Sequence, residues 1–377
     1  MVQPIYLDYN GTTPIDSDVF ETMLPFMEHS FGNPSSSNFY GIIPKKAVET
    51  ARRQVAGLIN CKSDEIIFTS GGTESNNHAI KGIAHAMVDR GKHIITSMIE
   101  HPAVIEVCRF LEKMGFSVTY LPVDRDGLVS LSSVTEAIRP DTVLITIMHA
   151  NNEVGTIQPI AEISRLAHER GIIMHTDAAQ STGKIPVDVD KLGADLLSIA
   201  GHKLYGPKGI GVLYIRKNIK VEKFCHGAGQ EMGKRAGTEN VAGIAGLGKA
   251  CEIALESLEN YMTETKILRD MLYKELKHKI KGVKLNGHRY KRLPNTLSLS
   301  FKGMDANRLL KKTGLDVAAS AGAACHSGGV EISHVLQAMD VPMELARGTL
   351  RFSVGRMTTA NDIRRAVEVI VGAVNEQ

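Results

Sequence analysis

The feature that most constrains the fold is the regular alternation of short apolar runs with helix-like segments through the first two-thirds of the chain. The runs predicted as strands cover residues 65–70, 93–97, 118–122, 143–149, 172–176, 196–200 and 211–215. Helix-like segments lie between them at 75–89, 103–114 and 160–169. Strands that are apolar throughout require cover on both faces of a sheet. The pattern therefore predicts an α/β fold built on a mostly parallel, seven-stranded sheet.

A second, smaller unit is predicted toward the C-terminus, as the length of 377 residues leads one to expect. Residues 240–279 contain no Pro and are dominated by Ala, Leu, Glu and Lys, which favours one long helix connecting two domains. Beyond it, strands are expected at 296–301, 317–320 and 350–354. Helices are expected at 306–313, 333–339 and 361–374. This mixture indicates a smaller α+β domain.

Composition excludes several classes of protein. Lys plus Arg number 44 against 41 for Asp plus Glu, so a nucleic acid is not expected as the main partner. The apolar stretches are too short to cross a bilayer, and residues 1–10 lack the features of a secretory signal. The cysteines are scattered without CxxC spacing, which argues against a disulfide framework or a metal site: Cys61, Cys108, Cys225, Cys251 and Cys325. We expect a cytoplasmic enzyme without a metal.

Two ionisable residues follow predicted strands and could carry chemistry. Lys203 lies in a Gly- and Pro-rich segment after the strand at 196–200, where a lysine can lose its charge and react with an aldehyde. Asp177 follows the strand at 172–176, and a buried carboxylate there needs a cationic partner. Taken alone, Lys203 could be a surface residue and Asp177 the partner of a structural Arg or Lys. Together they are the pair that pyridoxal phosphate (PLP) requires.

A third element joins a predicted strand to a helix at residues 69–76, with the sequence TSGGTESN. Gly72 lets the backbone approach a ligand, and Thr73 adds a hydroxyl close to the start of the helix. Backbone N–H groups and the helix dipole at such a turn favour an anion. Many turns of this composition are only tight turns, so the motif gains meaning from the other two.

The ordered motifs of the whole chain resemble those of the cysteine desulfurases, which are class V aminotransferase-like, fold-type I PLP enzymes. The matching segments are YLDYN at 6–10, GNPSS at 32–36, TSGGTESNN at 69–77, Glu100-His101, NNEVG at 151–155, HTDAAQ at 175–180, GHKLYGPKG at 201–209 and RAGTEN at 235–240. The resemblance implies a homodimer. It also implies a large PLP-binding domain over residues 15–255 and a small domain formed by 1–14 and 256–377 that carries a catalytic Cys loop.

The resemblance further implies a role for each matching residue. Lys203 would hold PLP covalently, Asp177 would pair with the pyridine nitrogen, and His101 would stack on the ring and assist proton transfer. Asn152 and Gln180 would contact the ring hydroxyl. Gly72, Thr73 and His202 would bind the phosphate, and Thr238 would complete the phosphate site of the neighbouring subunit. Asn33 and Arg351 would bind the substrate carboxylate.

Cys325 lies among small residues and glycines at 319–329. A buried, inert thiol is the commonest fate of a free cysteine. The glycines instead predict an exposed, mobile loop, and the position matches the family's nucleophilic cysteine. The other four cysteines are interpreted as structural. The resemblance thus implies that sulfur passes from L-cysteine to Cys325 as a persulfide, with release of L-alanine and transfer to an acceptor or scaffold protein.

Three positions depart from the family pattern: Asn38 replaces a His, Ala200 replaces a phosphate-binding Ser, and His326 follows Cys325 where Thr is usual. The context of Ala200 and His326 is closer to selenocysteine lyases, which share the PLP residues. Two alternatives to a desulfurase therefore stay open. One is a selenocysteine lyase, and the other is a sulfur-relay scaffold without turnover. The sequence does not identify the sulfur acceptor, so iron–sulfur cluster assembly and tRNA or DNA modification are all compatible with it.

Overall fold

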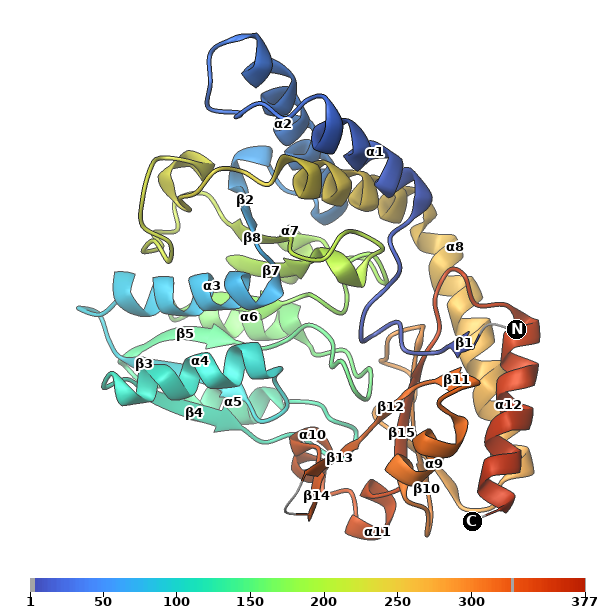
Figure 1. The fold of residues 1–377 in the computed structure, drawn as a ribbon. Helices are drawn as coiled ribbons and strands as arrows, with labels where there is room; N and C mark the ends of the chain where they lie inside the picture. The colour runs from blue at the N-terminus through green and yellow to red at the C-terminus, as the bar shows by residue number, and fades with distance from the viewer. Residues whose placement is uncertain (1–3, 327–328, 377) are drawn as a thin grey trace.

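The structure of the chain, a computed structural model, describes residues 4–326 and 329–376, and the side chains of residues 4–322 and 332–376. Its large sheet has seven strands, in the order β2-β8-β7-β6-β5-β3-β4 (Figure 1). The strands are β2 (Ile66–Thr69), β3 (His93–Ser97), β4 (Ser117–Leu121), β5 (Thr142–Thr146), β6 (Ile173–Asp177), β7 (Leu196–Ala200) and β8 (Gly211–Ile215). β8 is antiparallel to both neighbours, and the other strands are parallel to one another. The predicted mostly parallel, seven-stranded α/β fold is confirmed.

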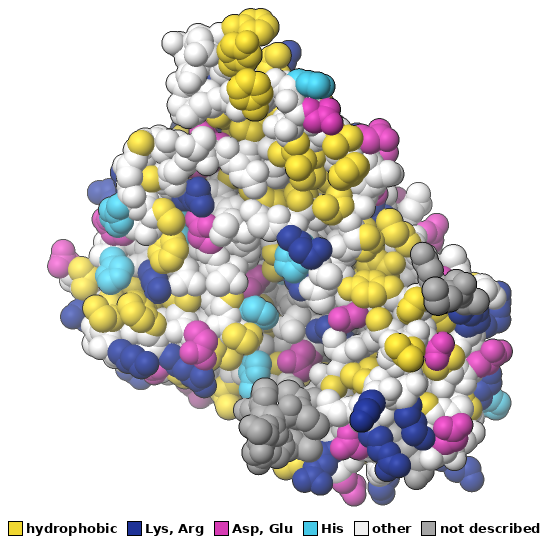
Figure 2. Space-filling model, viewed as in Figure 1, with side chains coloured by type: hydrophobic (Ala, Val, Ile, Leu, Met, Phe, Trp, Pro, Cys, Tyr) yellow, Lys and Arg dark blue, Asp and Glu magenta, His cyan; other side chains and the backbone are white. Residues whose placement is uncertain are grey.

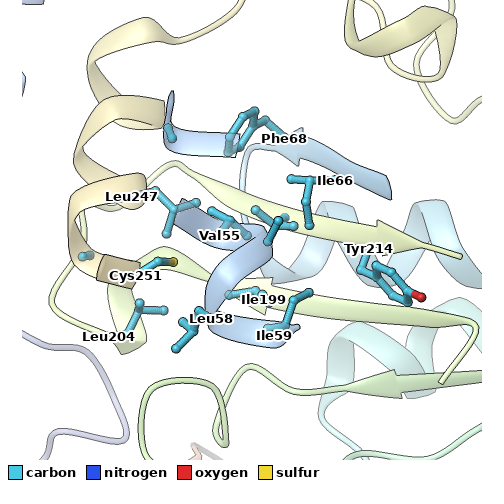
Figure 3. Close-up of a cluster of buried hydrophobic side chains, with 14 of the residues drawn as sticks. Val55, Leu58, Ile59, Ile66, Phe68, Ile199, Leu204, Tyr214, Leu247 and Cys251 are labelled. Carbon is cyan, nitrogen blue, oxygen red and sulfur yellow. The ribbon is translucent and has the colours of Figure 1, made fainter. Parts of the chain in front are cut away.

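Helices cover both faces of this sheet because successive strand side chains point to opposite sides. One face packs against α3 (Gly72–Ala86) and α4 (Pro102–Lys113). The other packs against α2 (Phe39–Ile59), α5 (Leu131–Ala137), α6 (Ile160–His168) and the first part of α8 (Val241–Lys279). In β2, Ile67 belongs to the first core, whereas Ile66 and Phe68 belong to the second, which Figure 3 shows with Leu247 of α8. This arrangement explains the unbroken apolar strands.

The smaller sheet has the order β12-β15-β10-β9 and is antiparallel. Its strands are β9 (Val283–Asn286), β10 (Thr296–Phe301), β12 (Ser320–Ala321) and β15 (Thr349–Ser353). It packs against α9 (Ala306–Thr313), α12 (Ala360–Asn375) and the second part of α8. Ile5 and Leu7 from the N-terminus join this core, and β1 (Ile5–Tyr6) pairs with β11 (Val317–Ala318). Both chain ends therefore meet in one small core, although the boundary at 255/256 stays a prediction.

The long helix α8 extends over 39 residues, or about 58 Å at 1.5 Å per residue. Leu247 and Cys251 near its start pack under the large sheet, and Leu272 and Leu276 near its end pack under the small one. The predicted connecting helix is thus confirmed. Among the described helices, none has an apolar stretch long enough to cross a lipid bilayer.

Several elements differ from expectation. α1 (Ser17–Glu28) and α2 were not predicted, and the expected strand at 317–320 is split between β11 and β12 in different sheets. The segment around Cys325 was expected to be an exposed, mobile loop; in the structure it includes two strands that pair antiparallel, β13 (Ala323–His326) and β14 (Gly329–Ile332). The remaining elements are short: α7 (Val189–Leu192), α10 (His334–Ala338), α11 (Met343–Ala346), and the 3₁₀ turns η1 (Ser63–Glu65), η2 (Gly201–Lys203) and η3 (Glu231–Gly233).

Candidate active site

A cavity of about 350 Å³ opens at the carboxyl ends of the parallel strands. This edge is where ligands bind in open α/β sheets, because loops and helix N-termini converge there. Figure 2 shows that the molecule is hollowed in the middle of this face, with histidine and charged side chains at the rim. The predicted site residues that line the cavity are Gly72, Thr73, His101, Asn152, Asp177, Gln180, His202, Lys203 and Arg351. Residues from five strand ends and from the small sheet therefore meet at one place.

Lys203 ends the η2 turn that follows β7. Its Nζ donates hydrogen bonds to the carbonyl oxygens of Asn10 and Gly11, each at 2.6 Å. Burial and the positive charge of Arg351 lower the pKa of Lys203 to about 8. A lysine with a pKa this close to neutrality has an appreciable fraction of unprotonated, nucleophilic amine.

Asp177 is the last residue of β6 and is 7% exposed. Its Oδ2 accepts a hydrogen bond from Asn76 Nδ2 at 2.7 Å, and its Oδ1 accepts one from the backbone N of Ala179 at 2.9 Å. Among the described side chains, no cation forms an ion pair with Asp177. A carboxylate that is buried, held by neutral donors and exposed to the cavity fits a protonated pyridine nitrogen.

The anion pocket lies where α3 begins. A Cβ on Gly72 would lie 3.3 Å from the Cβ of Ala200, so the two backbones approach closely at this point. His202 contacts Thr12 Oγ1 through Nδ1 at 3.1 Å, and burial together with nearby lysines lowers its pKa to about 4. A neutral His202, the α3 N-terminus and Thr73 form a cradle of donors that fits a phosphate.

His101 is the N-cap of α4, and its Nδ1 accepts a hydrogen bond from the backbone N of Ala103 at 3.1 Å. This contact leaves the proton of the neutral ring on Nε2. Desolvation by the surrounding protein and the charge of Lys203 lower the pKa of His101, although Asp177 acts in the opposite direction. A neutral imidazole at the cavity wall suits both ring stacking and proton transfer.

Gln180 and Asn152 are held by residues that the sequence did not reveal. Gln180 Nε2 donates to Asn10 O at 3.0 Å, while its Oε1 accepts from the buried Lys184 Nζ at 2.8 Å. Asn10 Nδ2 donates to the carbonyl oxygen of Asn152 at 3.1 Å. Asn10, Asn76 and Lys184 are thus additional site residues. Asn10 and Asn76 lie in the motifs YLDYN and TSGGTESNN, and this position in a motif was the only sequence feature that could have indicated their role.

Two predicted residues lie outside the cavity, and the side chain of a third is not described. Asn33 is exposed in the turn between α1 and α2, where its Oδ1 accepts from Ser35 N, and it does not line the cavity. Thr238 is exposed on the segment before α8 and does not line the cavity; it lines a neighbouring pocket with Thr69 and Ser70. Cys325 lies on β13 opposite Val330, but its side chain and that of His326 fall outside the described residues.

The hairpin that carries Cys325 is attached to the cavity rim at its base. Ser333 N donates to Gly322 O at 2.9 Å, and Ser333 Oγ donates to Glu153 at 2.5 Å, next to Asn152. His334 Nε2 donates to Glu100 O at 2.9 Å, next to His101. The base of the hairpin therefore adjoins two loops of the site.

Three other cysteines behave as structural residues. Burial raises the pKa of Cys61, Cys108 and Cys251 to about 12. Such thiols remain protonated at neutral pH and are poor nucleophiles. Their predicted structural role agrees with this environment.

Comparison with known proteins gives one consistent result. The family model of the class-V aminotransferases matches residues 5–366. The cysteine desulfurase IscS of Dictyoglomus turgidum is 53% identical over 371 residues, which cover 98% of this chain and 94% of that protein. IscS of Methanosarcina thermophila is 51% identical over 367 residues, covering 97% of this chain and 91% of that protein.

Solved structures agree with the curated relatives. A NifS-like protein superposes with a TM-score of 0.94 at 37% identity, and the match covers all of both chains. The structure of SspA in complex with cysteine gives a TM-score of 0.83 at 39% identity, covering 94% of this chain and 99% of that chain. The sequence and fold comparisons thus point to the same group of proteins.

Proposed function

Because the chain belongs to the cysteine desulfurases of the class-V aminotransferase family, we propose that it removes sulfur from L-cysteine and passes it on through Cys325. The chain is a PLP-dependent enzyme, as its relatives are. The observation that carries the proposal is the meeting of Lys203, Asp177 and Arg351 in one cavity. L-Cysteine is supported as substrate by the solved complex of SspA with cysteine.

The residues present fit PLP on their own chemistry. Lys203 would hold its aldehyde carbon, Asp177 its ring nitrogen, and Asn152 with Gln180 its ring hydroxyl. Gly72, Thr73 and His202 would hold the phosphate, and His101 would cover the ring. When bound, PLP supplies an electron sink that acidifies the α-proton of an amino acid and activates its β-carbon.

The side chains of the cavity would bind the substrate and move its protons. Arg351 binds the carboxylate, because a guanidinium matches a carboxylate with two parallel hydrogen bonds. Lys203, with a pKa of about 8, can accept the α-proton as a free amine and return it as an ammonium group. His101, held as a neutral ring with its proton on Nε2, can donate a hydrogen bond from Nε2 to a group bound in the cavity.

Cys325 would take the sulfur. As a thiolate it attacks the sulfur of bound cysteine, so that a sulfur–sulfur bond forms while the carbon–sulfur bond breaks. The electron pair of the broken bond stays with the carbon, which takes a proton and leaves as part of L-alanine. The persulfide on Cys325 then gives its outer sulfur to an acceptor or scaffold protein. A thiol of ordinary pKa needs a base to reach the thiolate form for this step. His101 has no free nitrogen for that task as it is held here, because its Nδ1 accepts from Ala103 N and its Nε2 carries the proton.

A homodimer is supported by an exposed apolar patch on α1, α2 and the turn between them, which we call the α1–α2 patch. Figure 2 shows hydrophobic side chains gathered over these helices. Its members are Met27, Phe31, Phe39, Tyr40 and Ile42, each between 58% and 73% exposed. A continuous patch of this kind usually marks an interface. Thr238, which is exposed and does not line the cavity of its own chain, would complete the phosphate site of the partner, and Asn33 would contribute to carboxylate binding.

The finer biological setting is also proposed. The enzyme is placed in the cytoplasm by this proposal, and delivery of its sulfur to iron–sulfur cluster assembly fits the IscS names of the relatives. A scaffold without turnover is set aside because the chain belongs to a family of enzymes. Selenocysteine lyase activity stays the second candidate, favoured only by the Ala200 and His326 departures.

The test compares wild type with Cys325→Ala. The variant should retain the visible absorption band of the Lys203–PLP linkage, since no PLP contact is changed. It should lose alanine formation from L-cysteine by at least about a hundredfold, as expected when a nucleophile is removed. Alanine formation from selenocysteine could persist, because a carbon–selenium bond is weaker. A wild type that prefers selenocysteine and barely turns over cysteine would refute the desulfurase assignment.

A further inference from the structure

Arg351 is engaged on its small-domain side by two residues that have no assigned role. Its Nη2 donates to Asp8 Oδ1 at 2.7 Å and to Ser320 Oγ at 2.8 Å. Its Nη1 donates to the carbonyl oxygen of Asn152 at 3.1 Å. Ser320 Oγ in turn donates to Asp8 Oδ1 at 2.9 Å, which closes a triangle. Arg351 lines the cavity, whereas Asp8 and Ser320 lie behind it.

The donors of this guanidinium can be counted. An arginine has five N–H groups in a fixed plane, and Nη2 contributes two of them. Both Nη2 hydrogens are taken, one by Asp8 and one by Ser320. Nε is buried and has no partner among the residues that the structure describes. A carboxylate can be bound through two parallel bonds at either of two edges, Nε with Nη2 or Nη1 with Nη2, and both edges use an Nη2 hydrogen.

Two-pronged binding of a substrate carboxylate therefore requires Nη2 to release a present partner. Two carboxylates on one guanidinium repel each other, so the charged partner is the one that is displaced. Asp8 can leave without losing all its donors, because Ser320 Oγ already donates to it.

We propose that Asp8 is a specificity-determining residue, a resident carboxylate that occupies Arg351 and is exchanged for the carboxylate of the amino-acid substrate. Asp8 keeps the guanidinium oriented and partnered in the absence of substrate, and it sets the affinity for the incoming carboxylate. Ser320 is paired with Arg351 across β12 and β15 and lies three residues before the start of β13. Exchange at Arg351 therefore takes place beside the strand that leads to Cys325. The inference rests on the proposed role of Arg351.

If Asp8 exchanges with the substrate carboxylate, removing its charge should strengthen carboxylate binding; if Asp8 only anchors Arg351, the same change should weaken it. Asp8→Asn keeps the shape and an acceptor oxygen but removes the charge, so Arg351 is released more easily. A charge-assisted hydrogen bond is stronger than a neutral one, and the difference corresponds to about a fivefold change in binding. We expect the Kd for L-alanine, followed by the change in the visible spectrum of the holoenzyme, to fall by about fivefold. The KM for L-cysteine should fall in parallel, with kcat changed less.

The matched control is Asp16→Asn. Asp16 belongs to the same N-terminal segment and pairs with Arg356 at 3.2 Å, and both side chains are about one-fifth exposed. It also caps α1, a function that Asn retains. This variant should bind L-alanine like wild type, and Asp8→Glu should restore wild-type affinity because it restores the charge.

An unchanged or higher Kd in Asp8→Asn would overturn the proposal, since a residue that only positions Arg351 would weaken binding when altered. If Asp8→Asn does not fold, Asp8→Ser serves the same purpose with the same expected direction. The outcome is separable from that of the proposed function. A wild type that forms no alanine from L-cysteine would refute desulfurase activity, while its affinity for L-alanine would still be measurable.

Discussion

At the scale of single residues, the clearest consequence concerns Lys203. Burial and Arg351 lower its pKa to about 8, from an ordinary value of 10.5. Only the unprotonated amine reacts with an aldehyde, so the rate of PLP capture by the apoenzyme should rise with pH and level off above about pH 8. An unperturbed lysine would give a rise that continues beyond pH 10. Stopped-flow absorbance of apoenzyme mixed with PLP measures this profile.

A second experiment tests whether Arg351 is a cause of the lowered pKa of Lys203. Arg351→Gln removes the cation that lowers the pKa of Lys203, so the midpoint of the profile should move to higher pH. Lys208→Gln is a suitable control, because it removes a cation of the same loop that does not contribute to the shift of Lys203. A midpoint near 10 in wild type would contradict the environment described for Lys203.

A second prediction at this scale concerns Ala200, which lines the anion pocket against Gly72. Ala200→Ser adds a hydroxyl within hydrogen-bonding reach of the position expected for a phosphate oxygen. A hydrogen bond to a charged group contributes about 1.5 to 3 kcal/mol, so the Kd for PLP should fall by at least about tenfold. Titration of apoenzyme with PLP measures it. Ala200→Val, which adds bulk without a donor, should weaken binding; equal or weaker binding by the Ser variant would show that the pocket is already satisfied.

At the scale of elements, the sequence predicted the large sheet well and the N-terminal helices not at all. Strands β3, β7 and β8 have the predicted bounds because each is a short run with an apolar centre next to a turn. α1 and α2 contain Pro25 and Pro44 within their spans, which hide the helical pattern. Asn38, noted only as a departure from the family, is the N-cap of α2, and its Oδ1 accepts from Gly41 N at 3.3 Å. A capping role gives Asn38 a structural explanation.

The site residues divide in a similar way. Those at strand ends, such as Asp177 and Lys203, could be predicted because a buried charge is costly unless it has a partner, which suggests a bound ligand. Asp8, Asn10 and Lys184 could not, because their roles depend on contacts with segments more than a hundred residues away. Such long-range pairings cannot be predicted from the local sequence around each residue.

The same long-range pairing yields a prediction about the segment that carries Thr238. Glu231 accepts hydrogen bonds from Arg52 Nη1 at 2.8 Å, Arg52 Nη2 at 2.9 Å and Phe68 N at 2.8 Å. It holds this position with a φ of +47°, which is unfavourable for a residue with a side chain. The buried ion pair ties η3, just before Thr238, to α2 and β2.

Breaking one partner of a buried ion pair leaves the other charge uncompensated and typically costs about 3 to 5 kcal/mol. We expect Glu231→Gln to lower the free energy of unfolding by this amount in urea denaturation. Glu106→Gln is the control, since its pair with Arg109 is more than 60% exposed on both sides and should contribute less than about 1 kcal/mol. Equal effects of the two substitutions would show that the Arg52–Glu231 pair does not hold this segment.

At the scale of the whole molecule, the position of Thr238 and the exposed α1–α2 patch both favour a homodimer. The cavity of one chain contains the residues proposed to hold the PLP ring and aldehyde and the substrate carboxylate, whereas Thr238 does not line it and the α1–α2 patch is exposed. In a homodimer, burial of the patch would remove apolar surface from water and bring each exposed Thr238 toward the other cavity. Dimerisation and PLP binding would then depend on each other.

This dependence can be measured. Wild type should have twice the chain mass of 41.0 kDa in light scattering, and Phe39→Asp, which places a charge in the α1–α2 patch, should shift the population to monomers. The monomers should bind PLP about tenfold more weakly, because they lack the hydrogen bond from the partner's Thr238. Thr238→Ala should weaken PLP binding to a similar extent while leaving the mass unchanged. Met114→Asp, at an exposed position at the end of α4, should change neither property. Monomers of Phe39→Asp that bind PLP as tightly as wild type would mean that each cavity is complete within its own chain.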